Sequence, residues 1–492
     1  MNSYYRVAPQ VLLLALCLTG RADVRFGSVF TDHAVLQRDL PVEIWGDCDA
    51  NEGVAVTVGA VTKSATGDAD GRWRVTLPPM PAAKVPVTMT AKGETTSATL
   101  QDILVGEVWL VNGQSNIEHP VKEFEHGAET AANSANANIR MFTVAQALSA
   151  TPLAHCKGAW QLASPQTTPN WSAVGYYLAA TLYKDLDVPI GIVNSSYGAT
   201  GITSWMPLQV MKPMPDLTEW IAGKEQKQAD YEAALAKWNA LAVKPAAPKN
   251  PMNLNYPGGC YNAMLAPIMN LTFRGMVWYQ GESNAVPNSS DKYEGYITAM
   301  LKDRRASRNV GDFPVLIVQI APFAQGDNKP NSRNDWAIVR DAQRRAAVAL
   351  PNCALTVITD LDAGMHPSKK LEVGQRLALS ARALGLGEKI ECQGPLYAGM
   401  KVDGAQVRVS FTHAAGLKLP EGQTGFVLAG ADKIFYPAEA VVAGDEVIVS
   451  SAQVPTPLAV RYNYVNLPAG KLCNAAGLPA SCFRSDDWAC GK

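Results

Sequence analysis

The chain has 492 residues, enough for about three domains that each bury a core of their own. Its 43 basic and 44 acidic residues give a net charge of −1, and neither sign forms a long run. This balance argues against a nucleic-acid tract or a polybasic membrane patch. We therefore expect the partner to be a small molecule or a glycan.

The first 22 residues have the pattern of a secretory signal peptide. A basic residue precedes an apolar segment at 11–19, and small residues follow it up to Ala22. This order predicts cleavage near Ala22 and a secreted or periplasmic protein. A lipoprotein anchor at Cys17 is disfavoured because Leu16, the residue before it, is bulky. No other stretch of the sequence has the roughly 18 apolar residues that a membrane span needs.

The cysteine count points to an oxidising compartment. Of nine cysteines, eight remain once Cys17 is removed with the signal, so we expect disulfides. Three cysteines lie close together near the C-terminus: Cys473, Cys482 and Cys490. They are candidates for disulfides that hold the C-terminal segment, although their spacing leaves the pairing open. No CxxC pair is present, which argues against a zinc ribbon.

Residues 23–101 alternate apolar and polar positions and contain no helical stripe. Gly, Asp and Pro turns separate the alternating segments, which lie at 41–45, 54–58, 73–77 and 87–90. This pattern predicts a small antiparallel β-sandwich domain over residues 23–101.

The pattern changes over residues 102–394, where apolar runs alternate with helical stretches. Such alternation is typical of βαβ units and predicts an α/β domain with a parallel sheet. Five runs are expected to be its strands: 108–111, 189–193, 274–279, 314–320 and 355–359. Because the carboxyl ends of parallel strands meet at one edge of a sheet, the residues after these runs should be neighbours.

Two further segments complete the organisation. Residues 213–258 contain a helical pattern and then a Pro-rich connector, so we expect a helical insertion that borders the cleft. The pattern favours a solvated structural helix over a helix with a role at the cleft. Residues 395–492 return to alternating segments and predict a second β-rich domain at the C-terminus.

The residues at the predicted strand ends have the functional groups that acyl transfer needs: a nucleophilic hydroxyl, a base and oxyanion donors. Ser115 lies between a strand and the start of a helix, and its N–H is one candidate donor. The N–H of Gly198 and the side-chain amide of Asn284 are two others. His366 is the candidate base, because it is the only one of the six histidines that falls at an end of these strands.

Other chemistries lack their motifs. No G-x-S-x-G elbow is present, which disfavours the α/β-hydrolase family proper, and P-loop, G-x-G-x-x-G and H-E-x-x-H patterns are also absent. His119 and His126, with Glu118, Glu123 and Glu125, form a weak candidate for a metal site. A solvated loop beside the cleft explains these charges better, so we predict neither a metal nor a cofactor.

Four blocks of the sequence resemble the sialate O-acetylesterase family of SGNH hydrolases. They are Gly-Gln-Ser-Asn at 113–116, the segment at 198–205, Trp-Tyr-Gln-Gly-Glu-Ser-Asn at 278–284, and Met-His-Pro at 365–367. The segment at 261–267 and the C-terminal Leu-Pro-Ala-Ser motif match as well. The resemblance extends from about residue 25 to the end, and the blocks are specific in combination although each is weak alone.

The resemblance implies a three-layer α/β/α SGNH-hydrolase domain with a five-stranded parallel sheet, between N-terminal and C-terminal β-rich domains. It also implies a carbohydrate esterase with Ser115 as nucleophile and His366 as base. The Ser115 N–H, the Gly198 N–H and the Asn284 amide would form the oxyanion hole. The reaction would pass through an acetyl-enzyme without metal or cofactor.

One position departs from the pattern of SGNH enzymes. Many of them place an acid three residues before the histidine, and here that residue is Ala363. Asp362 and Asp360, four and six residues before His366, are the nearest carboxylates. We favour Asp362 as the residue that orients the imidazole, with Asp360 or a backbone carbonyl in a Ser–His dyad as alternatives.

The resemblance favours 9-O-acetylated sialic acid as the substrate, and acetylated xylan or xyloglucan is the second candidate. A third hypothesis is a glycan-binding protein with an inactive hydrolase domain, but the intact Ser115, Asn284 and His366 argue against it. A sialate carboxylate requires a cation near the cleft. The candidates are Arg274, Arg333 and Arg340.

Overall fold

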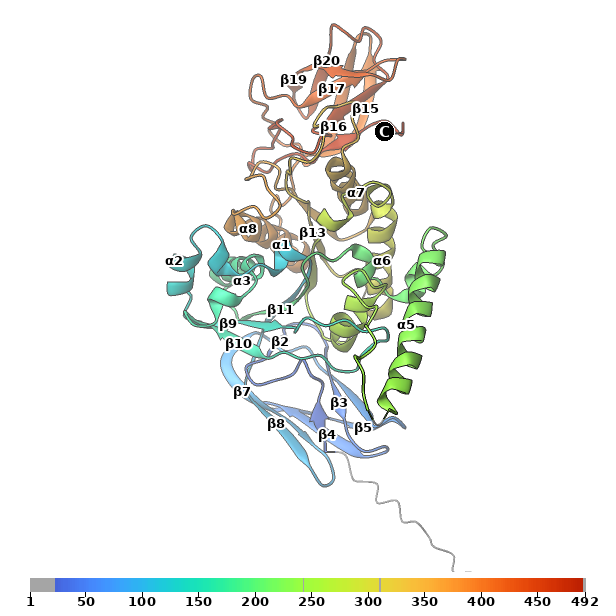
Figure 1. The fold of residues 1–492 in the computed structure, drawn as a ribbon. Helices are drawn as coiled ribbons and strands as arrows, with labels where there is room; N and C mark the ends of the chain where they lie inside the picture. The colour runs from blue at the N-terminus through green and yellow to red at the C-terminus, as the bar shows by residue number, and fades with distance from the viewer. Residues whose placement is uncertain (1–22, 242, 309–310, 490–492) are drawn as a thin grey trace, which may run out of the picture.

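The computed structural model describes residues 23–241, 243–308 and 311–489. Figure 1 shows a β-rich N-terminal part at one end of the molecule, an α/β part in the middle and a β-rich C-terminal part at the other end. The predicted signal peptide, residues 1–22, lies outside the described residues, as does Cys490.

A mixed sheet forms the middle layer of the α/β part. Its strand order is β10 (Trp160–Ala163), β9 (Asn136–Thr143), β11 (Ile190–Ser196), β8 (Ser97–Gly113), β12 (Gly275–Tyr279), β13 (Val315–Val318) and β14 (Cys353–Thr356). Six of these strands are parallel, and β10 pairs antiparallel with β9. The five predicted strands are all present, but the predicted count of five parallel strands was wrong.

The parallel strand that the sequence analysis did not predict is β9, which contains a buried arginine in its centre. Arg140 is 1% exposed, and its guanidinium donates to Asp102 Oδ1 (2.9 Å) and to the carbonyl of His33 (2.9 Å). These acceptors compensate the burial of the charge. An arginine interrupts the apolar run by which a buried strand is recognised in sequence, so β9 escaped prediction.

Helices cover both faces of the sheet, which makes three layers. Trp109 and Val111 of β8 pack in one core with α3 (Ala173–Leu186) and α8 (Lys370–Ser380). Val108 and Leu110 face the opposite core, which includes side chains of α6 (Tyr293–Arg308) and α7 (Asp335–Ala349). The alternation along β8 follows from the two-residue period of a strand that is buried on both faces.

The N-terminal part has two groups of strands. One is β1 (Arg25–Phe26), β3 (Val42–Asp47) and β6 (Arg72–Leu77), and the other is β2 (Val35–Gln37), β4 (Gly53–Val58), β5 (Val61–Thr66), β7 (Ala83–Lys92) and the beginning of β8. Strand β8 pairs with β7 in the N-terminal part and then with β11 and β12 in the α/β part. The predicted boundary between residues 101 and 102 therefore falls inside one strand.

A buried carboxylate joins the two parts. Glu107 of β8 has a side chain that is 1% exposed, and it accepts from Arg38 Nε (2.5 Å) and from Arg274 Nε (3.0 Å). Arg38 follows β2 in the N-terminal part, whereas Arg274 precedes β12. One carboxylate thus neutralises a cation from each part.

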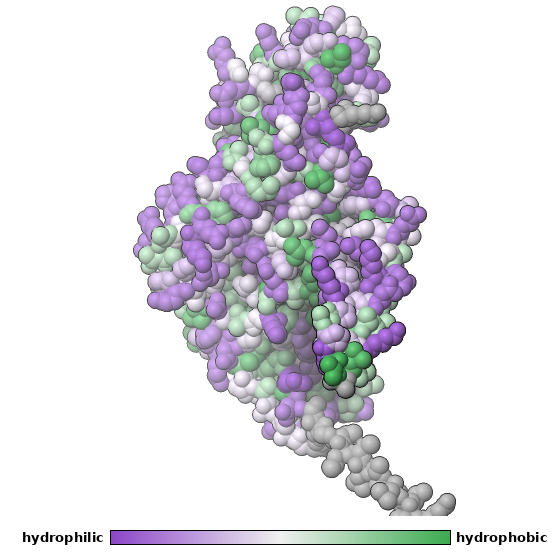
Figure 2. All heavy atoms as spheres, viewed as in Figure 1, coloured by the Kyte–Doolittle hydropathy of each residue, from purple (hydrophilic) through white to green (hydrophobic). Residues whose placement is uncertain are grey.

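The predicted insertion contains α5 (Thr218–Asn239), whose buried residues are Ile221 and Gln228. The helix lies along one side of the molecule in Figure 1. Figure 2 shows that this face of the protein is mostly hydrophilic. Among the described residues, no helix is both long enough and apolar enough to cross a membrane.

The C-terminal part consists of two four-stranded sheets. The first has the order β15 (Leu396–Asp403), β16 (Gln406–Thr412), β20 (Glu446–Ser450) and β19 (Glu439–Ala443). The second has the order β18 (Phe435–Pro437), β17 (Phe426–Ala429), β21 (Ala459–Tyr462) and β22 (Phe483–Arg484).

The expected disulfides are not found within the described part of the chain, where all seven cysteines are free. Cys482, one of the candidates, is 1% exposed, and burial raises the pKa of its thiol to about 11. A thiol that stays protonated and buried is a poor partner in disulfide exchange. Cys490, another candidate, lies outside the described residues.

Removing the charge of Glu107 should destabilise the protein, because two arginines would lose their common partner. We expect Glu107→Gln to lower the free energy of unfolding by about 3–5 kcal/mol, measured by chemical denaturation. Glu43→Gln is the control: its side chain is 29% exposed and 4.0 Å from Arg74, so the loss should stay below about 1 kcal/mol. Equal losses in both variants would contradict a central role for Glu107.

Candidate active site

Ser115 lies where β8 turns into the short helix α1 (Ser115–Glu118). Gly113, at the end of the strand, has a φ of +151°, and a Cβ there would lie 2.0 Å from the carbonyl oxygen of Tyr279 in β12. Only glycine fits this close approach of two backbones. The turn therefore places Ser115 at the carboxyl edge of the sheet, as predicted.

His366 is 251 residues away in the sequence and contacts Ser115 directly. Its Nε2 lies 2.9 Å from Ser115 Oγ, which is hydrogen-bonding distance. His366 belongs to the loop between β14 and α8, at the same edge of the sheet. The structure thus brings together the predicted nucleophile and the predicted base.

Gly198 lies beside Ser115 in the segment that follows β11. A Cβ at this position would be 2.9 Å from Glu118 Oε2 and 3.6 Å from Ser115 Cβ. The carboxylate of Glu118 could move aside for a small side chain, so these distances show only that the Gly198 backbone lies close to the nucleophile.

Asn284 ends the short helical turn at Glu282–Asn284, which follows β12. Its Oδ1 accepts from the backbone N–H of Ile202 (3.0 Å), and its Nδ2 donates to Ser289 Oγ (2.9 Å). Nδ2 carries two protons, and the bond to Ser289 is the one that it donates among the described residues, so a second proton is available to another acceptor. Asn284 therefore binds the segment that contains Gly198 while it retains a donor.

Two glutamines that the sequence analysis missed connect three strand ends. Gln280 Nε2 lies within hydrogen-bonding distance of Gln114 Oε1 (3.1 Å), the carbonyl of Thr200 (3.1 Å) and Asn284 Oδ1 (2.7 Å). Gln114 precedes Ser115, and Gln280 is fully buried. Both residues stand in the sequence blocks quoted above, but a glutamine in a turn has no specific signal of its own.

A buried polar network anchors the loop of His366 and was also missed. Asn116 Nδ2 donates to the carbonyl of Met365 (2.9 Å) and to Glu282 Oε1 (2.5 Å), while its Oδ1 accepts from Lys370 Nζ (2.6 Å). The residue after the nucleophile is therefore bonded to the residue before His366.

Burial changes the acidity of both charged members of this network. Lys370 is 1% exposed, and burial lowers the pKa of its ammonium group to about 7. Burial likewise raises the pKa of Glu282. The signal for this lysine was available, because Lys370 shares one helix face with the buried Val373 and Leu377.

The pKa of His366 lies below its usual value of 6.5. Burial is the largest cause, followed by the positive charges of His119 and Lys370, whereas Glu123 acts in the opposite direction. A base with a lowered pKa stays unprotonated, and so able to accept a proton, in weakly acidic solution.

Within the described residues, neither predicted acid forms a hydrogen bond or an ion pair with His366. The carboxylate of Asp362 accepts from the backbone N–H groups of Ser368 and Lys369, at the turn into α8. Asp360 pairs with Arg376, whose Nη1 lies 2.7 Å from Asp360 Oδ1. Among the described residues, the ring of His366 has a single hydrogen-bond partner, Ser115. None of the three predicted orienting groups, Asp362, Asp360 or a backbone carbonyl, is hydrogen-bonded to this ring in the part of the chain that the structure describes.

Two of the three candidate cations lie away from the site. Arg274 pairs with Glu107 at the amino end of β12, and Arg340 is fully buried, with its guanidinium bonded to backbone carbonyls. Arg333 donates to Ser290 Oγ (2.9 Å), and Ser290 follows the residue that Asn284 contacts. Arg333 also pairs with Asp291 and Asp335, so its charge is already compensated.

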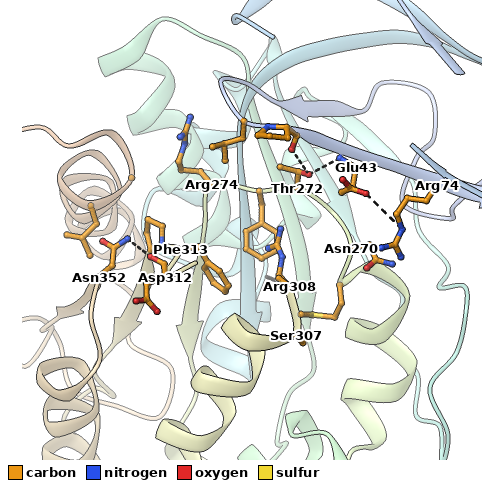
Figure 3. A pocket seen from close by; sticks show the side chains of 17 residues that line it. Glu43, Arg74, Asn270, Thr272, Arg274, Ser307, Arg308, Asp312, Phe313 and Asn352 are labelled. Atoms are coloured by element: carbon orange, nitrogen blue, oxygen red, sulfur yellow. Dashed lines mark hydrogen bonds and ion pairs between the residues drawn. The ribbon is translucent and has the colours of Figure 1, made fainter. Parts of the chain in front are cut away.

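A pocket of about 850 Å³ lies at the opposite edge of the sheet (Figure 3). Residues before β12, β13 and β14 line it, among them Thr272, Phe313 and Asn352. It is therefore separate from the carboxyl edge that contains Ser115.

The described residues contain no group of three or more His, Cys, Asp or Glu side chains placed to hold a metal ion. His119 Nδ1 lies 2.5 Å from Glu123 Oε2, and His126 is close to Glu125 and Glu129. These histidines therefore form separate ion pairs and do not converge on one point.

Comparisons with known proteins identify the family of this chain. Residues 105–382 match the family model described as "Carbohydrate esterase, sialic acid-specific acetylesterase". Sialate O-acetylesterase from Rattus norvegicus is 29% identical over 429 residues, which cover 78% of this chain and 79% of that protein. The Homo sapiens enzyme is 28% identical over 409 residues, with 76% and 73% covered.

A solved structure is similar over nearly the whole chain. A carbohydrate acetylesterase from Xanthomonas citri has a TM-score of 0.82 and 33% identity, and the similarity covers 94% of this chain and 100% of that one. The family match includes Ser115, Gly198, Asn284 and His366. The chain belongs to the sialic acid-specific acetylesterase family of carbohydrate esterases.

Proposed function

We propose that this protein is a carbohydrate O-acetylesterase that hydrolyses acetyl esters of sugars through an acetyl-enzyme on Ser115. The distance of 2.9 Å between Ser115 Oγ and His366 Nε2 carries the proposal, because it pairs a nucleophile with a base at the edge of the sheet. Family membership and the names of the relatives support the reaction class. The pattern of residues 1–22 supports secretion or a periplasmic location.

Acylation begins when Ser115 Oγ attacks the acetyl carbonyl carbon and gives its proton to His366 Nε2. The tetrahedral intermediate collapses as the bond to the sugar oxygen breaks, and His366 returns the proton to that oxygen. Water then attacks the acetyl-enzyme with His366 as the base. Acetate leaves, and Ser115 regains its proton.

Three donors are proposed to stabilise the oxyanion: the N–H of Ser115, the N–H of Gly198 and the amide of Asn284. Ser115 begins α1, so its N–H has no acceptor within that helix. Asn284 retains a free amide proton, and Gly198 lies next to the nucleophile. Donors fixed before the reaction stabilise developing negative charge without reorganisation.

The first proposed substrate is 9-O-acetylated sialic acid; the names of the curated relatives support an O-acetylated sialate without specifying the acetyl position. The second candidate is a neutral acetylated glycan such as xylan or xyloglucan. The positions of Arg274 and Arg340 favour it, since neither reaches Ser115 to bind a sialate carboxylate.

A substrate panel tests both the activity and its substrate. We expect acetate release from at least one of 9-O-acetylated sialic acid, acetylated xylan and acetylated xyloglucan. Ser115→Ala should lower kcat about 1,000-fold or more, because it removes the attacking oxygen. Ser410→Ala in the C-terminal part is the control and should match the wild type. Turnover that survives in Ser115→Ala would eliminate the nucleophile, and binding without any turnover would favour a glycan-binding protein.

Asn284→Ala should lower kcat about 100- to 1,000-fold with little change in KM, because an oxyanion donor acts on the transition state. Asn255→Ala is the matched control. Asn255 Oδ1 accepts from the backbone N–H of Gly201 (3.1 Å), in the same segment after β11 that Asn284 binds. Asn255→Ala therefore removes a hydrogen bond that holds this segment but keeps the amide donor of Asn284. Steady-state kinetics would distinguish the two variants, and equal losses would assign Asn284 to loop support alone.

The pH dependence should reflect the lowered pKa of His366. The imidazole must be neutral to accept the serine proton, so kcat/KM should fall as the pH drops through a pKa below 6.5. A pH–rate profile with p-nitrophenyl acetate measures this limb. A limb above pH 6.5 would contradict the assigned environment of His366.

A further inference from the structure

In the part of the chain that the structure describes, no carboxylate bonds to the ring of His366 as in a Ser-His-Asp triad, yet the ring must keep Nε2 directed at Ser115. The carboxylate of Asp362 binds backbone N–H groups at the turn into α8, and Asp360 binds Arg376. The backbone tether from Asn116 to Met365 fixes the loop but leaves the rotation of the imidazole free.

A second imidazole packs against this ring. The centroids of His119 and His366 are 4.3 Å apart, and their planes are tilted by 51°. This separation is slightly shorter than the roughly 4.5–7 Å that is usual for packed aromatic rings. His119 therefore covers one side of His366 and restricts its rotation.

His119 is itself held on several sides. Its Nδ1 lies 2.5 Å from Glu123 Oε2, and its ring meets Phe124 edge-on at 5.9 Å. Its backbone N–H donates to the carbonyl of Ser115 (2.9 Å), one turn earlier. The side chain is 29% exposed, so it is half-buried at the rim of the site. The pair is thus rigidly linked to the backbone of the nucleophile.

We propose that His119, held by Glu123, is the positioning residue for His366 and replaces the orienting carboxylate of a triad. The inference rests on the proposed role of His366 as base. His119 touches neither the reacting atoms nor the proton in transit, and it acts by restricting the ring of His366.

The same arrangement affects the charge of His366. The charged groups around its ring are His119, Glu123 on the segment after α1, and Lys370 on α8. A protonated His119 opposes protonation of His366, and Lys370 does the same, whereas Glu123 favours it. Loss of the imidazole at position 119 should therefore raise the pKa of the base.

Two substitutions separate packing from charge. His119→Ala removes the ring, and we expect kcat to fall about 10- to 100-fold, the cost of a misplaced catalytic group. His119→Phe restores a ring without nitrogen atoms, and therefore without the contact to Glu123, so it should recover kcat to about the level of Glu123→Ala. In both variants the acidic limb of kcat/KM should move to higher pH. A structural role alone would not produce that shift together with rescue by phenylalanine.

Glu123→Ala tests whether the carboxylate acts through His119. We expect kcat to fall in Glu123→Ala, as in His119→Ala. The double variant should be no slower than His119→Ala alone. His155 is the matched control, because it lies 3.3 Å from Asp47 in another ion pair and is half exposed. His155→Ala should keep the wild-type kcat and pH profile.

Three outcomes would overturn the inference: wild-type kinetics in His119→Ala, equal losses in His119→Ala and His119→Phe, or a loss confined to Asp362→Asn. The last would return the orienting role to the carboxylate. Ser115→Ala and His366→Ala serve as references with p-nitrophenyl acetate. If both are inactive while His119 variants behave as wild type, only the positioning inference fails. If Ser115→Ala stays active, the proposed function fails first.

Discussion

The side chain of Asn116 is the contact on which the site depends. It joins the helix of Ser115 to the loop of His366 through the carbonyl of Met365, and it separates a buried ammonium group from a buried carboxylate. An amide is suited to this place because it donates and accepts at once. Lys370 and Glu282 would each be costly to bury alone. The Asn116 amide compensates both, because it accepts from Lys370 and donates to Glu282.

This arrangement explains how residues from distant parts of the chain keep their geometry at an exposed edge. The parallel register brings the ends of β8, β11 and β12 together, and Gln280 then links them through side-chain hydrogen bonds. His366 arrives on a loop, which by itself would be mobile. The buried network ties this loop to the sheet, while the surface of the site remains open to a sugar.

The sequence was sufficient to predict the five central strands and the neighbourhood of Ser115, Gly198, Asn284 and His366. Apolar runs and the topology of parallel sheets carry that information. Strand β9 was missed because the buried Arg140 breaks its apolar run. The network of Asn116 and Lys370 was missed for a related reason, since a polar residue gives no sign of burial until its partners are known. Asp362 lies close to His366 in sequence, but its carboxylate faces a turn.

Strand β8 has a consequence for how this architecture is inherited. One strand of 17 residues, whose pairing with β7 is irregular around residues 101–102, joins the N-terminal sheet at its beginning and ends two residues before Ser115. A recombination point at residues 101–102 would cut hydrogen-bonded backbone on both sides. The N-terminal part therefore cannot be replaced as an independent domain. An insertion within the strand would shift its register and so change the position of Ser115. The described strands of the C-terminal part form sheets separate from the central one, so recombination there would leave that register intact.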